Sequence, residues 1–503
     1  MKNFFCLLLG LAIGGLILAL PGSIFISWEI QATAAVTILM VIWWVTEAIP
    51  IPATALVPLV GFPLLGVLTP AEASAPYADK TIFLFLGGFI IAAAMQKWNL
   101  HRRIALSIIL LTGTSPKQII LGFMIATAFI SLWISNTATA MMMIPIAVAI
   151  IGTIGVDAFR EKSGDESGLD FAKALVISIA YAASIGGLGT IIGSPPNGIF
   201  LAQLKTLFPD APSIGFVDWM LFGIPLVAIF IPLTWLWLVY GPFKHLPSKL
   251  PQSREIITDE LKKLGRITPG ERWTLIVFIM TALMWIFSAT KKIGEITIPG
   301  LDILFPGIDD STIAMFGAIL LFLLPVNIKN REYTMDWASV LKIPWGILIL
   351  FGGGICLSKG FIKSGLADEL VKHLTSLAIL DVLLIVLLVA ILVSFLTEVT
   401  SNTAIASVMM PILAVTSISL MINPVILMLT AALTASLAFM LPVATPPNAV
   451  AYGTGYLSMR DLMKTGFILN MISVVLITLF MYTIVLWALG VSFELPVWAV
   501  APK

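Results

Sequence analysis

The stretch SNTATAMMMIP (residues 135–145) sets three polar residues inside a long apolar segment, and SNTAIASVMMP (401–411) repeats the pattern 266 residues later. The whole chain of 503 residues is 59% hydrophobic and only 11% charged, against about 25% charged residues in an ordinary soluble domain. Because apolar runs long enough to cross a bilayer recur from end to end, the chain is predicted to be an integral membrane protein. Nothing in its composition indicates a nucleic-acid partner.

The two triplets mark the middles of two predicted hairpins. Each apolar segment, 118–152 and 379–420, has room for two short helices and is interrupted at its triplet. Non-helical backbone at membrane depth is tolerated only where it is buried in protein or lines a cavity. The pattern therefore predicts two re-entrant hairpins whose tips stop partway across the membrane.

Eleven transmembrane helices are predicted around the hairpins, which makes the fold all-α. Residues 1–32 hold the first of these helices, although the apolar start with Lys2 also resembles a secretory signal peptide. A run of this length favours a helix that stays in the membrane. The eleven expected spans are 4–21, 33–50, 52–67, 81–98, 174–205, 218–241, 272–289, 312–327, 345–358, 424–455 and 463–489.

The sequence repeats itself in two halves. FLFLGGFI (83–90) matches LILFGGGI (348–355), and GSPPN (193–197) matches ATPPN (444–448). The first matched helices lie five spans apart, an odd number, so the halves are predicted to cross the membrane in opposite directions, as in many secondary transporters. The charged loop 157–173 is an insertion in the first half alone.

The expected domains follow from this inverted repeat. The first repeat covers 33–243, with an inner hairpin at 118–152 and a broken helix at 174–205; the second covers 272–503, with an outer hairpin at 379–420 and a broken helix at 424–455. Residues 244–271 form a polar connector. With a cytoplasmic N-terminus most of the 28 Lys and Arg fall on the cytoplasmic side, including those of the connector, which agrees with the positive-inside rule.

Each Pro-Pro pair inside a span breaks its helix, because the two prolines remove two backbone donors. The break frees carbonyl oxygens, which suit a hard cation such as Na⁺, and begins a half-helix whose positive N-terminus suits an anion. Hydroxyls of Ser194 and Thr445 stand at these junctions. An Asn side chain at a hairpin tip offers an oxygen for a cation and an NH₂ for a carboxylate. One Asn can therefore lie between ion and substrate.

Further polar residues lie beside the triplets. Ser131 and Thr397 each precede a triplet Ser by four residues, one helical turn, so their hydroxyls are predicted to face the same ion. Thr400 offers either its hydroxyl or its carbonyl oxygen. Glu398 fits a structural role and an ion-pathway role equally, whereas Glu47 near a span end is predicted to be structural.

These motifs resemble the paired signatures of the divalent anion:sodium symporter family, close to its bacterial sodium-coupled dicarboxylate transporters. The resemblance rests on SLWISNTATAMMMIP, AYAASIGGLGTIIGSPPN, LILFGGGICLS, FLTEVTSNTAIAS and AFMLPVATPPNAV and covers nearly the whole chain. It implies a homodimer in the cell membrane, in which each protomer carries substrate by an elevator motion. It also implies the ligands. The first sodium site would comprise Ser131, Ser135, Asn136 and Gly193, and the second Thr397, Thr400, Asn402 and Ala444; the substrate carboxylates would meet Asn136, Thr137, Ser194, Asn402, Thr403, Thr445 and Pro446.

The expected activity is sodium-coupled symport of C4-dicarboxylates such as succinate, malate and fumarate, with Na⁺ as the co-transported ion. Sodium-independent dicarboxylate exchange, and transport of sulfate or a tricarboxylate, stay open as alternatives. An enzyme is disfavoured because no nucleophile-base pair, metal cluster or phosphate loop emerges. A channel is disfavoured because broken-helix inverted repeats build a site that can be occluded.

Overall fold

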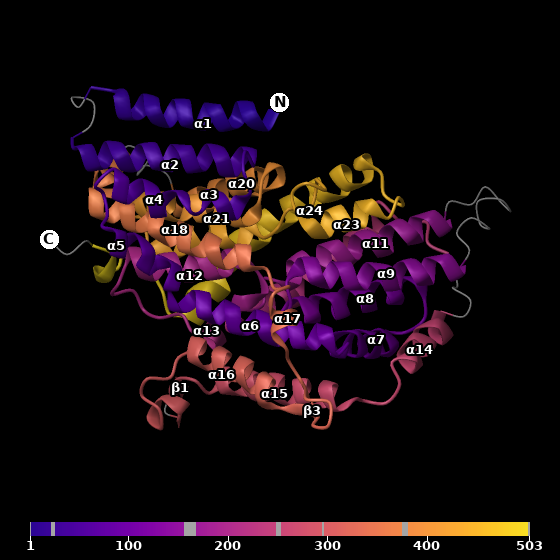
Figure 1. Cartoon of the computed structure of the whole chain (residues 1–503). Helices are drawn as coiled ribbons and strands as arrows, with labels where there is room; N and C mark the ends of the chain where they lie inside the picture. The colour runs from indigo at the N-terminus through magenta and orange to yellow at the C-terminus, as the bar shows by residue number, and fades with distance from the viewer. Residues whose placement is uncertain are drawn as a thin grey trace.

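The computed structural model describes residues 2–21, 26–154, 167–247, 253–293, 296–374 and 381–500, and these are mostly helical. Many long helices run roughly parallel to one another across Figure 1. By length and composition, eight helical stretches of the described residues could cross a membrane: Trp28–Thr46, Pro70–Lys97, Ser167–Gly186, Phe216–Tyr240, Trp345–Ser364, Val382–Val399, Asn402–Ser419 and Met459–Leu489. The mostly helical membrane architecture is confirmed, and the number of spans stays a prediction.

The N-terminal helix α1 (Lys2–Ala19) packs along α2 (Trp28–Thr46), and both lie along one edge of the molecule in Figure 1. The buried Gln31 side chain of α2 donates to two carbonyl oxygens at the end of α1, Ile17 O at 2.7 Å and Leu20 O at 3.0 Å. Helix α1 is therefore integrated into the fold, as expected of a first transmembrane helix.

Two predicted spans differ from the structure: 33–50 lies about four residues later than the observed helix, and 52–67 is two short helices in place of one. Helix α2 ends at Thr46, where Glu47 adopts a left-handed conformation (φ 48°). Two short helices follow, α3 (Ile51–Thr54) and α4 (Val57–Leu64). Prolines stand in the first turn of each. Proline favours a helix start and disfavours continuation, so one apolar run became two helices.

The rest of the first half contains a helical hairpin and an interrupted helix. Helices α8 and α9 meet at the first triplet, and the chain is non-helical or 3₁₀ between the end of α11 at Gly186 and the start of α12 at Pro195. The bounds are α5 (Pro70–Ser74), η1 (Ala75–Ala78), α6 (Lys80–Lys97), α7 (Leu100–Thr112), α8 (Pro116–Ser131), α9 (Asn136–Ile154), α11 (Ser167–Gly186), η2 (Ile191–Gly193), α12 (Pro195–Leu207) and α13 (Phe216–Tyr240).

The second half shows the same sequence of features, with α20 and α21 meeting at the second triplet and α22 and α23 separated by an irregular segment. Helix α24 continues through a π-helical turn (η5, Met481–Val485) into α25. The other bounds are α14 (Ser253–Lys263), α15 (Pro269–Ile286), η3 (Leu301–Ile303), α16 (Asp310–Leu323), α17 (Trp337–Val340), α18 (Trp345–Ser364), α19 (Leu366–Leu374), α20 (Val382–Val399), α21 (Asn402–Ser419), α22 (Pro424–Ala435), α23 (Pro446–Gly453), α24 (Met459–Phe480), α25 (Leu486–Leu489) and η6 (Val497–Ala499).

The structure adds elements that the prediction of an all-α fold omitted. Two small antiparallel sheets pair β1 (Lys291–Ile293) with β2 (Ile296–Ile298), and β3 (Pro325–Asn327) with β4 (Glu332–Tyr333). Helix α14 lies inside the predicted polar connector. This helix was not predicted, because its sequence contains no apolar run. Residues 155–166, most of the predicted insertion, lie outside the described residues.

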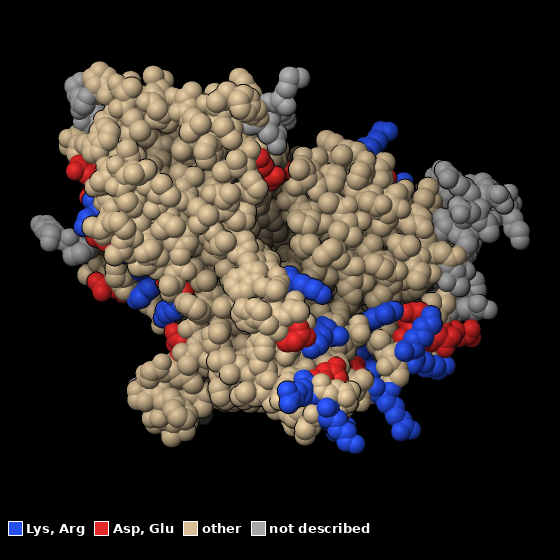
Figure 2. All heavy atoms as spheres, in the orientation of Figure 1, with Lys and Arg blue, Asp and Glu red and all other residues tan. Residues whose placement is uncertain are grey.

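Charged residues hold α14 in place. Arg102 of α7 forms an ion pair with Glu260 of α14, and Arg103 donates to Gly265 O, just after α14, at 3.2 Å. A hydrogen bond from Lys263, together with Arg102, lowers the pKa of Glu260 below its usual value. In Figure 2 the Lys and Arg side chains gather at this end of the visible face, over α7, α14, β3 and α17. The predicted connector thus docks on α7, at the end of the molecule where Lys and Arg side chains gather.

The two interrupted helices form the centre of the molecule. Every residue of α22 is buried, as is almost all of α11. Helix α8 packs on α11, and α20 packs on α22. Helices buried on all sides in a membrane protein are surrounded by other helices rather than by lipid. Each hairpin therefore lies against the interrupted helix that follows it in sequence, and this places each triplet beside a helix break.

Candidate functional site

At the first triplet, a hydroxyl, an amide and two carbonyl oxygens come together. Ser131, at the end of α8, is fully buried and donates its Oγ hydrogen to Ala183 O at 2.7 Å. The same hydroxyl lies 2.7 Å from the side-chain amide of Asn136, the first residue of α9. That amide lies 3.0 Å from Ala183 O and 3.2 Å from Gly193 O. Ser131, Asn136 and Gly193 were all predicted here; Ala183 was not.

These groups are nearly all hydrogen-bond acceptors, which is the arrangement a cation requires. With its oxygen toward Ser131, Asn136 faces acceptor oxygens alone; with its nitrogen there, it donates to Ala183 O, Gly193 O and Ser131 Oγ. The acceptor oxygens of the cluster thus require a positively charged partner. Either the amide hydrogens of Asn136 fill this role, or a cation does, and in the second case the amide oxygen turns toward the cation. Ser135, also predicted as a ligand, accepts from Ala138 N at 3.4 Å and caps α9.

Close backbone packing surrounds this cluster. A methyl group added at Gly187 would lie 2.6 Å from Asn136 Oδ1 and 3.0 Å from Gly193 O, and one added at Gly193 would lie 2.6 Å from Gly187 O. Contacts this short require movement of the neighbouring atoms. Gly187 and Gly193 therefore allow the backbone of the break to approach the Asn136 amide. Gly187 lies within the motif AYAASIGGLGTIIGSPPN, and no role was predicted for it.

The second triplet has the same geometry. Thr397, at the end of α20, is fully buried, and its hydroxyl oxygen lies 2.7 Å from Asn402 Oδ1 and 2.8 Å from Ala435 O. In both hairpins the hydroxyl reaches the amide five residues later, and no bond to the triplet serine four residues later is seen. Ala444, the counterpart of Gly193, is buried at the end of the second break. The two clusters thus form a structural pair, one from each half.

Of the two oxygens predicted for Thr400, the hydroxyl does not face the second cluster. Its Oγ1 donates to Trp44 O of α2 at 3.3 Å, so the hydroxyl points out of the cluster. Only the carbonyl oxygen of Thr400 stays available to a cation. The hydroxyl instead ties the second hairpin to α2.

Glu398 organises the second break. Its carboxylate accepts four hydrogen-bond donors: the backbone N–H groups of Phe439, Met440 and Leu441, at 2.7 to 3.0 Å, and the Asn470 side chain at 2.8 Å. Glu398 is buried and directly follows Thr397. The carboxylate thus satisfies donors that the broken helix leaves unpaired. This supports the structural role. Leu132 holds the equivalent position in the first hairpin and has no carboxylate.

Two asparagines of the Pro-Pro-Asn motifs brace the breaks in matching ways. Asn197 donates to Gly187 O at 2.9 Å and Thr190 O at 2.8 Å; Asn448 donates to Ala438 O at 3.1 Å and Leu441 O at 3.2 Å. Both are fully buried. They fix each irregular segment to the helix after it. The sequence showed these asparagines in matched motifs, which was a usable signal.

The predicted substrate residues lie at the helix starts after the breaks and at the triplets. Ser194 and Thr445 hold the N-cap positions of α12 and α23, and Pro446 is the first residue of α23. Ser194 Oγ lies 2.8 Å from Ser436 Oγ, so the breaks of the two halves touch. Thr137 and Thr403 follow Asn136 and Asn402 in the first turns of α9 and α21. In the first half, the Asn136 amide lies 3.2 Å from Gly193 O, two residues before the partly positive start of α12.

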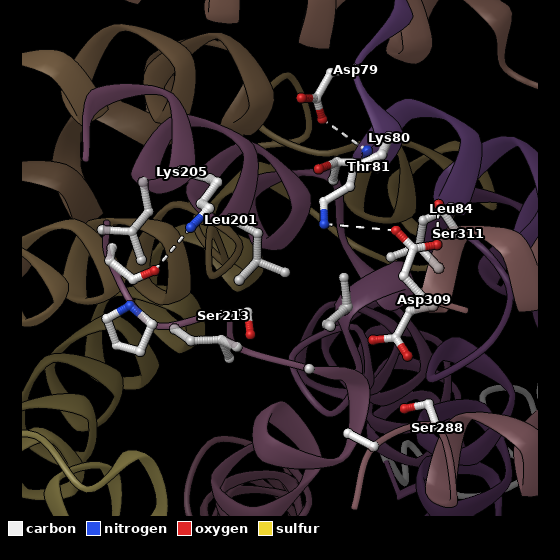
Figure 3. Close-up of a pocket in the computed structure, with 18 of the residues that line it drawn as sticks. Asp79, Lys80, Thr81, Leu84, Leu201, Lys205, Ser213, Ser288, Asp309 and Ser311 are labelled. Carbon is white, nitrogen blue, oxygen red and sulfur yellow. Dashed lines mark hydrogen bonds and ion pairs between the residues drawn. The ribbon is translucent and has the colours of Figure 1, made fainter. Parts of the chain in front are cut away.

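Two cavities lie at opposite ends of α6. One, of about 540 Å³, is lined by Ser135 and Thr137 of the first hairpin and by Gln96 and Lys97 at the end of α6. The other, of about 270 Å³, adjoins the start of α6. Figure 3 shows its lysines engaged: Lys80 points to Asp309, 3.6 Å away, and Lys205 to a backbone carbonyl. The first cavity is the one that reaches a predicted ligand.

Paired oxygen clusters at the breaks of discontinuous helices are typical of secondary membrane transporters. Residues 1–490 match the family model described as the sodium:sulfate symporter transmembrane region. The chain belongs to this family, so the resemblance to the divalent anion:sodium symporters is confirmed.

The relatives agree with this assignment. The chain is 43% identical to the sodium-dependent dicarboxylate transporter SdcS of Staphylococcus saprophyticus, over 97% of this chain and 93% of that protein. It is also 43% identical, with the same coverage, to SdcS of Staphylococcus aureus strain NCTC 8325.

Two solved structures share the fold at low identity. The YdaH transporter of Alcanivorax borkumensis matches with a TM-score of 0.53 and 13% identity, over 90% of this chain and 98% of that one. MtrF of Neisseria gonorrhoeae matches with a TM-score of 0.57 and 11% identity, over 92% and 96%. Both likenesses concern the fold alone.

Proposed function

We propose that this protein is a secondary transporter that carries C4-dicarboxylates such as succinate, malate and fumarate into the cell together with Na⁺. One observation carries the proposal: each hairpin tip joins an Asn amide and a hydroxyl to a carbonyl oxygen of a broken helix, once in each half. Relatives at 43% identity are named for sodium-dependent dicarboxylate transport. The same chemistry fits this chain because both triplets carry the Asn amide and the neighbouring hydroxyl that it requires.

Sodium supplies the charge that the site lacks. The four motifs contain no Lys or Arg, so a bound dianion meets amides, hydroxyls and helix starts. Sodium ions at the two clusters neutralise it. Asn136 with Thr137 receives one carboxylate, and Asn402 with Thr403 receives the other. A four-carbon dicarboxylate has one carboxylate for each half.

Uptake of radiolabelled succinate into proteoliposomes tests the proposal. We expect accumulation under an inward sodium gradient and little uptake when choline replaces sodium. Counterflow in sodium-free buffer would instead identify the protein as an exchanger. Faster uptake of sulfate or citrate than of succinate, at equal concentration, would show that the substrate belongs to a different class of anion.

Ser131→Ala and Thr397→Ala are each expected to raise the half-saturating sodium concentration about tenfold, since a lost hydrogen bond or ligand oxygen is worth about 1 to 1.5 kcal/mol. Succinate affinity at saturating sodium should change much less, because neither hydroxyl is proposed to touch substrate. Thr400→Val is the matched control: its hydroxyl bonds Trp44 O, so sodium affinity should stay within about twofold. Equal losses of sodium affinity and succinate affinity would contradict the assignment of these hydroxyls to the sodium sites.

Transport is expected to be electrogenic. Carrying a dianion inward against 100 mV costs about 4.6 kcal/mol, so more than two sodium ions must accompany it for the field to help. An inside-negative potassium diffusion potential should then accelerate succinate uptake. Uptake that ignores the imposed potential would indicate electroneutral transport.

The proposed motion is an elevator, in which both hairpins and both broken helices travel against a fixed remainder of a homodimer in the cell membrane, with the N-terminus in the cytoplasm. Hairpin tips that contact helix breaks, rather than helix ends, support re-entrant hairpins that end near the middle of the membrane. The tip residue Trp133 stacks with Trp285 of α15 at a ring distance of 6.5 Å, across the boundary between the two bodies.

A crosslink across that boundary is expected to arrest transport. In a background without Cys6 and Cys356, Trp133→Cys with Trp285→Cys should lose uptake when a short cleavable bis-thiol reagent joins them, and regain it on reduction. Each single cysteine variant, treated with the same reagent, controls for modification alone. Full transport by the crosslinked protein would argue for local gating in place of an elevator.

A further inference from the structure

The cavity at the end of α6 connects a hairpin tip to a basic surface. Its walls include Ser135 and Thr137 of the tip, Phe89 and Gln96 of α6, and Lys342 in the turn between α17 and α18. Among the described residues, Lys97 and Lys342 are the only charged ones in its lining. The cavity at the other end of α6 is lined by four aspartates as well as two lysines. The two cavities therefore differ in the sign of their charge.

The two lysines of this cavity are not equivalent. Lys97 Nζ lies 2.7 Å from Asp336 Oδ2, and that contact holds the pKa of the Asp336 carboxyl below its usual value. Asp336 is therefore ionised and compensates Lys97. Lys342 is exposed, and no carboxylate of the described residues lies within 4.0 Å of its ammonium group. Lys342 is thus the uncompensated positive charge on the path to the tip.

We propose that this cavity is the route by which the dicarboxylate reaches and leaves its site on the basic side of the membrane, and that Lys342 attracts the dianion along it. The inference rests on the proposed function and adds a residue to it. A single-sign charge in a cleft raises the local concentration of an oppositely charged substrate. Lys342 acts at a distance and is a positioning residue, since the bound substrate is held by amides and hydroxyls alone.

The test compares the two faces of the transporter in vesicles of known orientation. Lys342→Gln should raise the half-saturating succinate concentration about three- to tenfold on the basic side, as expected for a loss of electrostatic steering, and leave the opposite side unchanged. Lys342→Arg should keep the wild-type value. The difference between Lys342→Gln and wild type should shrink as the ionic strength rises to about 0.5 M, because salt screens the interaction.

Lys329→Gln is the matched control. Lys329 is an exposed lysine in the turn between β3 and β4, outside the cavity lining. Equal effects of Lys329→Gln and Lys342→Gln would assign the steering to the general surface charge and overturn the role of the cavity. An unchanged half-saturating concentration in Lys342→Gln would overturn it as well. Failure of the wild-type protein to take up succinate at all would refute the proposed function, so the two failures are distinguishable.

Discussion

Gly187→Ala is expected to lower sodium-driven succinate uptake about 100-fold, the effect of displacing a site by about 1 Å. The added methyl group would lie 2.6 Å from Asn136 Oδ1 and 3.0 Å from Gly193 O, so the Asn136 amide or the backbone of the break must move. Both belong to the first oxygen cluster. Initial rates of uptake, normalised to the amount of folded protein in the vesicles, measure the effect.

Gly152→Ala is the control for that substitution. Gly152 lies near the end of α9 in the same hairpin, is exposed, and has open space around the position of an added methyl group. Alanine in a helix is about 1 kcal/mol more favourable than glycine, so this variant should fold and transport normally. Wild-type uptake by Gly187→Ala would show that the first cluster is not the working site.

Glu398→Ala is expected to have the second large effect, on stability and transport together. Removal of the carboxylate leaves three backbone N–H groups and the Asn470 amide without their acceptor in a buried segment. A buried hydrogen-bond donor left without its acceptor costs about 1 to 3 kcal/mol. We expect a clearly lower melting temperature in detergent and a loss of uptake, since the segment carries Ala444 and Thr445.

Glu398→Gln separates the two roles that the sequence left open for this residue. The amide keeps one acceptor oxygen and the shape of the side chain, so stability should be only partly lost. Residual uptake with weakened sodium dependence would agree with a carboxylate that positions the second break. A melting temperature and sodium dependence equal to wild type in Glu398→Ala would contradict the structural role.

The central features could be predicted because they depend on short motifs. A helix cannot continue through a Pro-Pro pair from the preceding turn, and in the structure each pair begins a new helix after a break beside its triplet. Matched offsets then predicted that Ser131 and Thr397 play equivalent parts, as their hydrogen bonds show. Helices α7, α14 and α19 could not be found by a search for apolar runs, because they carry charged residues and lie against other helices.

Contacts between distant segments could not be predicted from the sequence. The donors to Glu398 come from residues 439–441 and from Asn470, so its structural role depends on tertiary packing. The direction of the Thr400 hydroxyl depends in the same way on Trp44, 356 residues earlier. Ser436 had no motif to mark it, and its contact with Ser194 requires both halves to be in place.

A reciprocal flux measurement tests sodium coupling directly, because symport couples the two gradients in both directions. Proteoliposomes with equal sodium on both sides receive an inward succinate gradient, with valinomycin and potassium holding the membrane potential at zero, and the movement of ²²Na⁺ and labelled succinate is followed together. We expect succinate to drive ²²Na⁺ inward, with more than two sodium ions for each succinate. Succinate entry without net movement of ²²Na⁺ would contradict sodium coupling.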